Sequence, residues 1–368
     1  MNATTNGLGN RDIIFPNIGE TLDIARSYRA YREKAYREGF TEFQRTAVPV
    51  ILNGKRYRAH PNINLYVDMT SACDADCDFC IAKVIFARTP SPIPPQWLSR
   101  ALDICAPANP SVQITGGEPT LFPEALKELL DVVSVRRPRR PVLNTNGRNL
   151  EAVASMLRQS AIEHINISRH HYNDNDNAKI MKRKGHEVSS VSLCDSISGM
   201  KNRVRMQCNL LDGEIDTYGE VMQFIAYCYY ALGVRSVVFA QLTPLPLMSY
   251  YDPSIVKSIT DAPVDVDSIL DHIERDSRFV FEKYRGGVAC YYEVWKFIGY
   301  EEPMTIIIKY SDNMWLEKAD DDPELLPDLV LHTDGTLAGS WCKDRKIICR
   351  FDEQEKIINF HRGRRLSQ

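Results

Sequence analysis

The sequence predicts an α/β protein built around a partial (β/α)6 barrel, which is a TIM-like barrel left open compared with the full eight-fold form. Between residues 63 and 242, short apolar patterns typical of strands alternate with longer helical patterns, which indicates βα units and a parallel sheet. The chain has 368 residues, of which 44% are hydrophobic and 25% are charged. This composition is typical of a globular protein with a large core.

The N-terminal part, residues 1–62, is expected to form a cap made of a helix and a hairpin. Residues 20–38 carry a partly apolar stripe with helical spacing, and Gly39 is a suitable stop signal. Asn53 and Gly54 stand between two short apolar or aromatic runs, 48–52 and 55–59. An Asn-Gly pair in that setting is a strong hairpin signal.

The barrel is expected to occupy residues 63–243. Its six predicted strands lie at residues 63–70, 111–115, 141–146, 164–169, 203–211 and 236–242. The helical patterns between them lie at residues 96–105, 124–135, 150–159, 175–182 and 217–232. In α/β barrels and sheets the functional loops lie at the carboxyl ends of the strands, so those loops are where chemistry is expected.

After residue 243 the alternation stops, and residues 244–368 are expected to form an α+β extension that closes the barrel and contacts substrate. Four prolines between residues 244 and 263 mark a long connection. A helix is predicted at 266–275, and strands at 305–310 and 329–341, the second with a turn at Asp334-Gly335. Residues 318–328 are acidic and contain two prolines, which indicates a solvent-exposed loop.

Charge and cysteine usage restrict the function classes. The formal net charge of −3 gives no strong signal for nucleic acid or another polyanionic partner. No signal-peptide pattern is evident at the N-terminus, and no run of ~18 apolar residues predicts a membrane span. The ten cysteines form no regular disulfide framework. A reducing, cytoplasmic location is therefore expected, where thiols stay free to bind metal.

Three of these cysteines, Cys73, Cys77 and Cys80, follow the first predicted strand with the spacing Cys-x3-Cys-x2-Cys. Thiolates are soft ligands that favour zinc, copper(I) or iron–sulfur clusters. A structural zinc site needs four ligands, and His60 would have to fold back to supply the fourth. A [4Fe–4S] cluster with only three cysteines keeps one iron open. From the spacing alone, zinc binding and reduced cysteines without metal remain open alternatives.

A second motif, Gly116, Gly117 and Glu118 followed by a proline, comes directly after the second predicted strand, 36 residues after Cys80. Glycines let the backbone turn sharply and approach a ligand closely, and a carboxylate can hold an ammonium group. With the cysteine motif and its aromatic Phe79, this sequence resembles the radical S-adenosylmethionine (SAM) superfamily. The resemblance covers about residues 63–242, and only these two motifs are specific.

The resemblance implies an enzyme with one [4Fe–4S] cluster and SAM as cofactors. Its open iron would chelate the amino and carboxylate groups of SAM, and Phe79 would lie against the adenine. The cluster ligands would be Cys73, Cys77 and Cys80, and the amino group of SAM would be held by Gly116, Gly117 and Glu118. In this family, reductive cleavage of SAM gives a 5′-deoxyadenosyl radical, which abstracts hydrogen from the substrate. An external electron donor such as flavodoxin or ferredoxin is also implied.

Further candidate SAM contacts lie at the ends of later strands. Asn146 belongs to the Thr-Asn-Gly that resembles the end of the family's third strand, and Ser168 ends the fourth, where many members contact the SAM ribose. On the fifth strand Arg205, Gln207 and Asn209 alternate with apolar residues, so they should share one face. They are candidates for contacts with SAM or substrate, and packing of polar barrel layers is an equal alternative.

Catalytic side chains are not identified by these motifs. His170 and His171 can move protons near neutral pH, and adjacent residues point apart, so at most one should face the centre. Cys208 could donate a hydrogen atom if it faced the lumen, although a buried cysteine is commonly a small hydrophobe. A second cluster is conceivable at Cys290, Cys342 and Cys349, but a single cluster is expected.

The reaction after hydrogen abstraction is expected to modify a small molecule or a peptide in a biosynthetic pathway, as an oxidoreductase or a lyase. The architecture resembles the branch that contains the molybdenum-cofactor cyclase, peptide-maturing enzymes and viperin. A viperin-like nucleotide-modifying enzyme is the first alternative, and a non-enzymatic zinc-binding scaffold is the second. The motifs do not specify the substrate, the product, the fate of SAM, the reductant or the oligomeric state.

Overall fold

The computed structural model describes residues 44–80, 82–85, 89–182, 188–242, 264–287, 290–311, 318–352 and 357–358. The helix predicted at 20–38 and the proline-containing connection 243–263 lie outside these residues. The described strands form two sheets, one of three strands and one of thirteen. None of the described helices has the length and apolar character needed to span a membrane.

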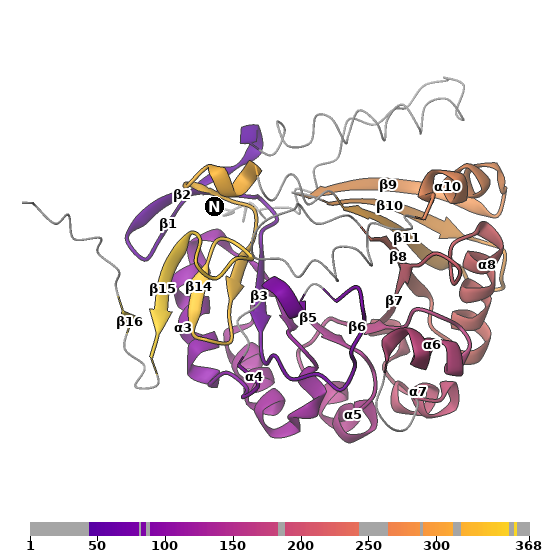
Figure 1. The fold of residues 1–368 in the computed structure, drawn as a ribbon, viewed down its shortest axis with the longest axis horizontal. Helices are drawn as coiled ribbons and strands as arrows, with labels where there is room; N and C mark the ends of the chain where they lie inside the picture. Colours follow the sequence, from indigo (N-terminus) through magenta and orange to yellow (C-terminus); the bar gives the residue numbers. More distant parts are fainter. Residues whose placement is uncertain are drawn as a thin grey trace, which may run out of the picture.

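Six consecutive parallel strands form the centre of the larger sheet. They are β3 (Asn64–Asp68), β4 (Ser111–Thr115), β5 (Arg139–Thr145), β6 (His164–Ser168), β7 (Val204–Leu210) and β8 (Ser236–Gln241). Each pairs in parallel with the next one along the chain. Figure 1 shows them as a curved row that encloses an inner side. The predicted α/β class and the open six-stranded barrel arrangement are confirmed.

Helices follow the strands and lie along the outside of this curved row (Figure 1). They are α3 (Pro95–Cys105), α4 (Pro123–Arg136), α5 (Leu150–Gln159), α6 (Asp174–Met181), α7 (Ser190–Ser196) and α8 (Tyr218–Tyr227). The short α2 (Ala82–Ile85) instead follows the cysteine loop after β3. The predicted helix at 217–232 is α8 followed by a π-helical turn, Cys228–Leu232, that ends at Gly233 with a φ of 67°. The short helices α2 and α7 were not predicted.

The hydrophobic core lies between the outer face of the sheet and these helices. Leu65 and Val67 of β3 are fully buried, as are Leu98 of α3 and Leu126 of α4. Burying one such side chain contributes roughly 1.5–3 kcal/mol, so the outer helices are held mainly by this apolar contact. The alternate strand residues face the inner side, and several of them are polar and only half-buried.

The C-terminal segment continues the sheet at both of its edges. At one edge β13 (Leu329–Leu331) runs parallel to β3 and is followed by β14 (Thr336–Ala338), β15 (Ile347–Phe351) and β16 (Ile357–Ile358). At the other edge β11 (Met304–Ser311) runs parallel to β8, followed by β10 (Cys290–Phe297) and β9 (Phe279–Gly287). The predicted turn at Asp334-Gly335 joins β13 to β14, and α10 (Val266–Arg275) matches its prediction. Strands β9, β10, β15 and β16 were not predicted.

The predicted N-terminal hairpin is formed by β1 (Val48–Leu52) and β2 (Lys55–Ala59). Asn53 and Gly54 have φ values of 46° and 76°, as a two-residue turn with two left-handed residues requires. The prediction of a solvent loop at 318–328 was wrong in part. Leu325 and Leu326 are fully buried and form β12 (Leu325–Leu326), which pairs with β2. Two apolar residues between a glutamate and a proline are too short a pattern to predict a strand.

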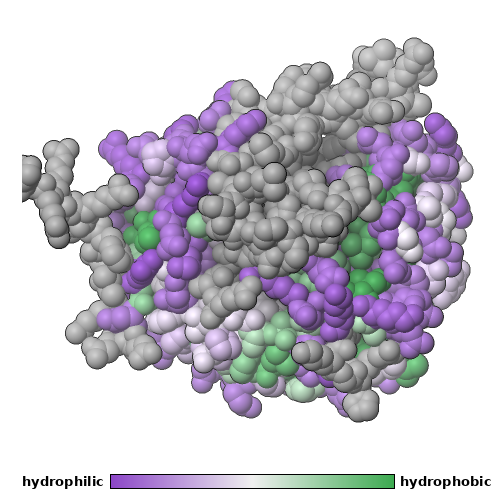
Figure 2. Space-filling model, viewed as in Figure 1, coloured by the Kyte–Doolittle hydropathy of each residue, from purple (hydrophilic) through white to green (hydrophobic). Residues whose placement is uncertain are grey.

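The coloured part of the face seen in Figure 2 is mostly hydrophilic, with smaller apolar areas near its lower edge and on both sides. The large apolar side chains that are most exposed, Val135, Val191 and Tyr230, are between 71% and 80% exposed. They lie on three different outer segments, α4, α7 and the π-helical turn. Single exposed apolar residues of this kind are normal on protein surfaces, so they indicate no particular partner.

Candidate active site

The cysteine loop after β3 and the Gly-Gly-Glu segment after β4 are joined directly at the carboxyl edge of the sheet. The backbone N–H of Gly117 donates to the carbonyl oxygen of Thr70 at 2.6 Å, and that of Glu118 donates to Ala72 at 2.7 Å. Parallel neighbouring strands place their carboxyl ends at the same edge. Two motifs separated in sequence therefore form one structural unit.

Both glycines are required by the close approach of the two loops. A Cβ atom at Gly117 would lie 2.0 Å from the carbonyl oxygen of Ala72, and one at Gly116 would lie 2.5 Å from that of Thr70. Gly116 also has a φ of 124°, which side chains disfavour. The sequence predicted that the glycines permit close approach to a ligand. The structure shows close approach to the backbone that leads into the cysteine loop.

The three predicted cluster ligands are free cysteines on this loop: Cys73 is exposed, Cys77 is buried and Cys80 is half-buried. The Cys77 thiol contacts the carbonyl oxygen of Met181 at 3.7 Å. Burial raises the pKa of Cys73 to about 11 and that of Cys77 to about 12. Negative charge on Cys80 and Cys73 raises the pKa of Cys77 further. The three thiols are thus within electrostatic reach of one another, and burial disfavours their ionised forms unless positive charge is supplied.

Lys83 supplies positive charge beside these thiols. Its ammonium group donates to the carbonyl oxygen of Cys77 at 2.9 Å and forms an ion pair with Asp76. It also lowers the pKa of Cys77 and of Cys80, opposing the effect of burial. A cation at this position stabilises thiolates, which are the form that binds metal.

The donor set of the loop fits an iron–sulfur cluster, because three free cysteines supply soft ligands from one short segment. Across the described residues, no three Cys, His, Asp or Glu side chains are grouped closely enough to hold one metal ion. A [4Fe–4S] cluster makes a different demand, since each thiolate binds a separate iron. The assignment of Cys73, Cys77 and Cys80 as its ligands stays a prediction.

Glu118 is fully buried, and its carboxylate is surrounded by protein donors. One carboxylate oxygen accepts from the Thr120 N–H at 2.9 Å, the Thr120 hydroxyl at 2.6 Å and the Thr145 hydroxyl at 2.7 Å. The other accepts from the Asn146 N–H at 2.5 Å. Burial raises the pKa of Glu118, whereas these hydrogen bonds oppose the rise. The predicted contact with the SAM amino group is untested, but the structure shows that Glu118 joins the ends of β4 and β5.

Asn146 connects the end of β5 to the cysteine loop. Its side-chain amide N–H donates to the Asp74 carboxylate at 2.6 Å and lies 4.0 Å from the sulfur of Cys73. Asp74 also pairs with Arg148 at 3.1 Å. The residue predicted as a SAM contact therefore touches the predicted cluster ligand loop.

The inner face of the sheet is polar, as the alternation along β7 predicted. Arg205, Gln207 and Asn209 are half-buried, whereas the residues between them are buried. Ser168 of β6 pairs in register with Gln207. The predicted orientation of the three polar side chains is confirmed, while the roles of these residues in binding SAM or substrate stay predictions.

His170 and His171 point to different neighbours. The His170 ring lies edge-on to Phe79 with 5.0 Å between centroids, and its Nδ1 accepts from the Asn209 N–H at 3.0 Å. The Nδ1 of His171 accepts from the Asn173 N–H at 2.9 Å. A ring nitrogen that accepts carries no proton, so the N–H of each neutral imidazole is at Nε2. Of the two, His170 is the one that lies against the cysteine loop.

The proposed role of Cys208 as a hydrogen-atom donor required it to face the lumen, and this condition is not met. Cys208 is fully buried in the hydrophobic core, on the face of β7 opposite Arg205 and Gln207. Burial raises the pKa of its thiol well above the usual value. Of the cysteines considered for a second cluster, Cys349 is buried in the core and Cys342 is half-buried. The side chain of Cys290 lies outside the described residues.

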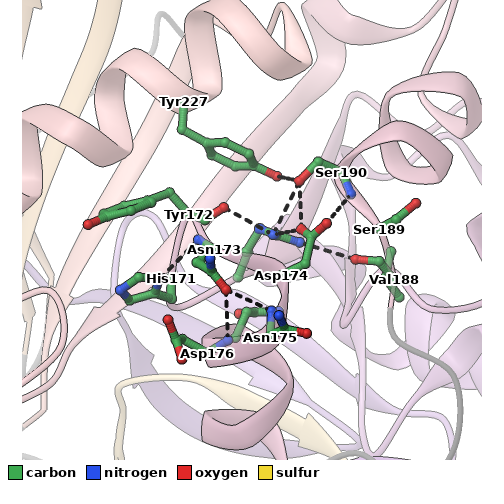
Figure 3. A network of polar contacts seen from close by, with 12 residues as sticks. His171, Tyr172, Asn173, Asp174, Asn175, Asp176, Val188, Ser189, Ser190 and Tyr227 are labelled. Carbon is green, nitrogen blue, oxygen red and sulfur yellow. Dashed lines mark hydrogen bonds and ion pairs between the residues drawn. The ribbon is translucent and has the colours of Figure 1, made fainter.

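Sequence reasoning missed a polar network at the end of β6, in which Asp174, Ser190 and Tyr227 lie close together (Figure 3). The buried Arg169 is bound to it. Arg169 forms an ion pair with Asp174, and its guanidinium lies 5.0 Å from the ring centre of Tyr227. Asp174 also accepts from the Ser190 hydroxyl at 2.6 Å and from the Ser190 N–H at 3.0 Å. This network fixes the loop that carries His170. An arginine directly after a strand, with an aspartate five residues later, is the only sequence signal for it.

Comparisons with known proteins agree with this geometry. The family model described as the radical SAM superfamily matches residues 67–225. The mitochondrial GTP 3′,8-cyclase of Arabidopsis thaliana is 23% identical over 216 residues, which cover 57% of this chain and 53% of the relative. The 7-carboxy-7-deazaguanine synthase of Methanothermobacter thermautotrophicus is 30% identical over 112 residues, covering 28% of this chain and 42% of the relative. The chain thus spans about half the length of the curated relatives it matches.

Among solved structures, Streptococcus suis SuiB bound to S-adenosylmethionine matches with a TM-score of 0.50 and 12% identity. The match covers 84% of this chain and 64% of SuiB. At this identity the likeness concerns the fold, and it extends beyond the barrel strands into the C-terminal segment.

Proposed function

The chain belongs to the radical SAM superfamily, whose enzymes use a [4Fe–4S] cluster and SAM, and from this premise we propose that Cys73, Cys77 and Cys80 hold the cluster. When bound, the cluster and SAM supply a carbon radical that removes a hydrogen atom from a substrate carbon. The protein contributes the orientation of the substrate and the exclusion of water.

The observation that carries this proposal is the double backbone link between the cysteine loop and the Gly-Gly-Glu segment. The N–H groups of Gly117 and Glu118 donate to carbonyl oxygens on either side of Ser71. These bonds hold the loop of Cys73 against the end of β4, so the thiols lie beside the segment that is proposed to receive SAM. Phe79 is proposed to face the adenine, with His170 behind its ring.

The substrate is proposed to be a small polar molecule that lies against the inner face of the sheet. Arg205, Gln207 and Asn209 present one cation and two amides there, and Asn166 donates to Asn144 at 2.8 Å on the neighbouring strands. Such groups can recognise carbonyl, amide and anionic parts of a substrate. The proposed domains are a cap of residues 1–62, a barrel of residues 63–243 and an extension of residues 244–368. The extension is proposed to complete the substrate site. An external one-electron donor is proposed to reduce the cluster.

A nucleotide substrate is the second candidate, and the names of the relatives favour it. GTP 3′,8-cyclase and 7-carboxy-7-deazaguanine synthase are named for a purine nucleotide and a deazapurine product. Purine nucleotides also combine hydrogen-bonding edges with anionic phosphate, which suits the amides and the arginine of the inner face. GTP is therefore the first compound to assay.

The test is anaerobic reconstitution of the full chain with iron and sulfide, followed by SAM and a strong reductant. The proposal predicts a brown protein with about four irons per chain that releases 5′-deoxyadenosine. Cys77→Ala should abolish both the colour and the product, whereas Cys349→Ala should retain them because Cys349 lies in the core. A wild-type protein that binds zinc, stays colourless and releases no 5′-deoxyadenosine would instead establish the zinc-binding scaffold.

A further inference from the structure

The site contains a side-chain donor directed at one of the proposed cluster ligands. We propose that Asn146 is a positioning residue whose amide donates an N–H···S hydrogen bond to Cys73 and thereby raises the reduction potential of the cluster. This inference rests on the proposed function, because it takes Cys73 as a cluster ligand. It concerns a property of the cluster that neither sequence motif specifies.

The contact itself is made across 73 residues of sequence. The amide nitrogen of Asn146 lies 4.0 Å from the sulfur of Cys73 and 2.6 Å from a carboxylate oxygen of Asp74. An amide nitrogen carries two N–H groups, so one can serve Asp74 while the other faces the sulfur. The backbone N–H of Ala75 is a second donor to Cys73, at 3.4 Å. Cys73 thus sits in a small group of donors.

The orientation of the Asn146 amide is fixed by its partners on both sides. Its oxygen accepts from the backbone N–H of Arg148 at 2.9 Å, and its nitrogen donates to a carboxylate oxygen of Asp74 at 2.6 Å. A flipped amide would place oxygen against the carboxylate and nitrogen against an N–H, and both contacts would be repulsive. The donor therefore points to the cysteine loop, not away from it.

The backbone of Asn146 is held from a third side. Its N–H donates to the buried carboxylate of Glu118 at 2.5 Å, and Glu118 is anchored in turn by Thr120 and Thr145. Asn146 is 8% exposed, so water competes little for its amide. This frame gives Glu118 a function in addition to any contact with SAM, because it determines where the Asn146 amide stands.

Hydrogen bonds to the sulfur ligands are among the factors that set the potential of an iron–sulfur cluster. Reduction adds negative charge to the cluster and its thiolates, and an N–H donor stabilises the more negative state. Removing the donor should therefore make the cluster harder to reduce. Cys73 is the most exposed of the three cysteines, so without Asn146 its sulfur would depend on the Ala75 N–H and on solvent.

The experiment measures the midpoint potential of the reconstituted full chain by potentiometric titration, followed by the EPR signal of the reduced cluster. Asn146→Leu removes both N–H donors at nearly constant size and should lower the potential. When wild type and variant are compared at the midpoint potential of the wild type, the ratio of reduced to oxidised cluster should be roughly fivefold lower in the variant. This corresponds to a midpoint potential that is ~40 mV lower for a one-electron couple. Asn146→Ala leaves room for a water donor, and its potential should lie between those of the wild type and Asn146→Leu.

Asn144→Leu is the matched control. Asn144 lies two residues earlier on β5, and its amide donates to the carbonyl oxygen of Ile114 instead of a cysteine. The midpoint potential of the cluster in Asn144→Leu should equal that of the wild type. Equal potentials for wild type and Asn146→Leu, or an equal shift in Asn144→Leu, would overturn the inference while the proposed function stands. If Asn146→Leu does not retain a cluster, Asn146→Ala decides by the same comparison. A wild-type chain that forms no cluster would refute the proposed function itself.

Discussion

The carboxyl ends of β3–β5 and the carboxyl end of β6 are stabilised in different ways. At β3–β5 the loops are joined by backbone hydrogen bonds, by glycines without room for a Cβ atom, and by the buried carboxylate of Glu118. At β6 the loop is held by side-chain contacts of Arg169 with Asp174, Ser190 and Tyr227. Backbone contacts tolerate almost no added volume, whereas a side-chain network depends on charge. The first region should therefore respond most to steric changes and the second to electrostatic ones.

The largest effect should come from Gly117→Ala. The new Cβ atom would lie 2.0 Å from the carbonyl oxygen of Ala72, which is backbone and cannot rotate away. The two loops must separate, so we expect a loss of at least about 3 kcal/mol in the free energy of unfolding and loss of cluster incorporation. Chemical denaturation and iron analysis measure the two effects.

Gly219→Ala is the control for this change, since a Cβ atom at Gly219 in α8 meets nothing closer than 3.8 Å. Alanine is favoured over glycine in a helix by about 1 kcal/mol, so this variant should be as stable as the wild type or more stable. Retention of full iron content and stability by Gly117→Ala would show that the loops are not held as described.

The second-largest effect on stability should come from Arg169→Met, which removes the positive charge of the β6 network and keeps a side chain of similar volume. Removing one partner of a buried ion pair typically costs 3–5 kcal/mol, and because Asp174 is partly exposed we expect about 3 kcal/mol in the free energy of unfolding. Asp174→Asn in the same chain should recover part of the loss, because the uncompensated carboxylate is then absent. If the double variant were less stable than Arg169→Met, the ion pair between Arg169 and Asp174 would not be what stabilises the network.

The same contrast explains what the sequence could predict. The cysteine and Gly-Gly-Glu motifs are contiguous in sequence, so their chemistry could be read from residue order. The hairpin at Asn53-Gly54 and strands β3–β8 were predicted because each depends on a local pattern of turn residues or alternation. These local signals were sufficient for the fold class and for placing the two motifs at the ends of neighbouring strands.

Contacts between distant residues could not be read in this way. Asn146 approaches Cys73, and Arg169 approaches Tyr227, only because the sheet brings strand ends together. The orientation of the β7 side chains could be predicted only in part. Alternation predicted that Cys208 and Gln207 face opposite ways, but the helices that cover one face are needed to show that Cys208 is on the covered side.

The third effect is a pH dependence from two buried histidines at opposite ends of neighbouring strands, His60 before β3 and His332 after β13. Burial lowers the pKa of each to about 4. Between about 6.5, the ordinary value, and 4, the unfolded chain binds a proton that the folded chain does not. The contribution of each histidine to stability therefore falls as the pH falls, by about 1.4 kcal/mol per pH unit. Buried carboxyls with raised pKa contribute in the opposite direction, among them Asp328, whose pKa is raised to about 7 by burial.

Urea denaturation of wild type and His332→Gln at pH 7, 6 and 5 measures this contribution. Relative to His332→Gln, the wild type should lose about 1.4 kcal/mol in the free energy of unfolding per pH unit below about 6.5. An equal slope in wild type and His332→Gln would mean that His332 is protonated in the folded chain.

The smallest effect should come from Thr145→Val, which tests the β3–β5 region without adding volume. The Thr145 hydroxyl donates to Glu118 at 2.7 Å and accepts from the Gly147 N–H at 3.1 Å. Valine has the same shape without the hydroxyl, so one donor to a buried carboxylate is lost, which costs about 1.5–2 kcal/mol in the free energy of unfolding. Thr120→Val removes another donor to the same oxygen. Because both donors serve one carboxylate, the double variant should lose more than the sum of the single losses, whereas strict additivity would mean that Glu118 does not couple β4 to β5.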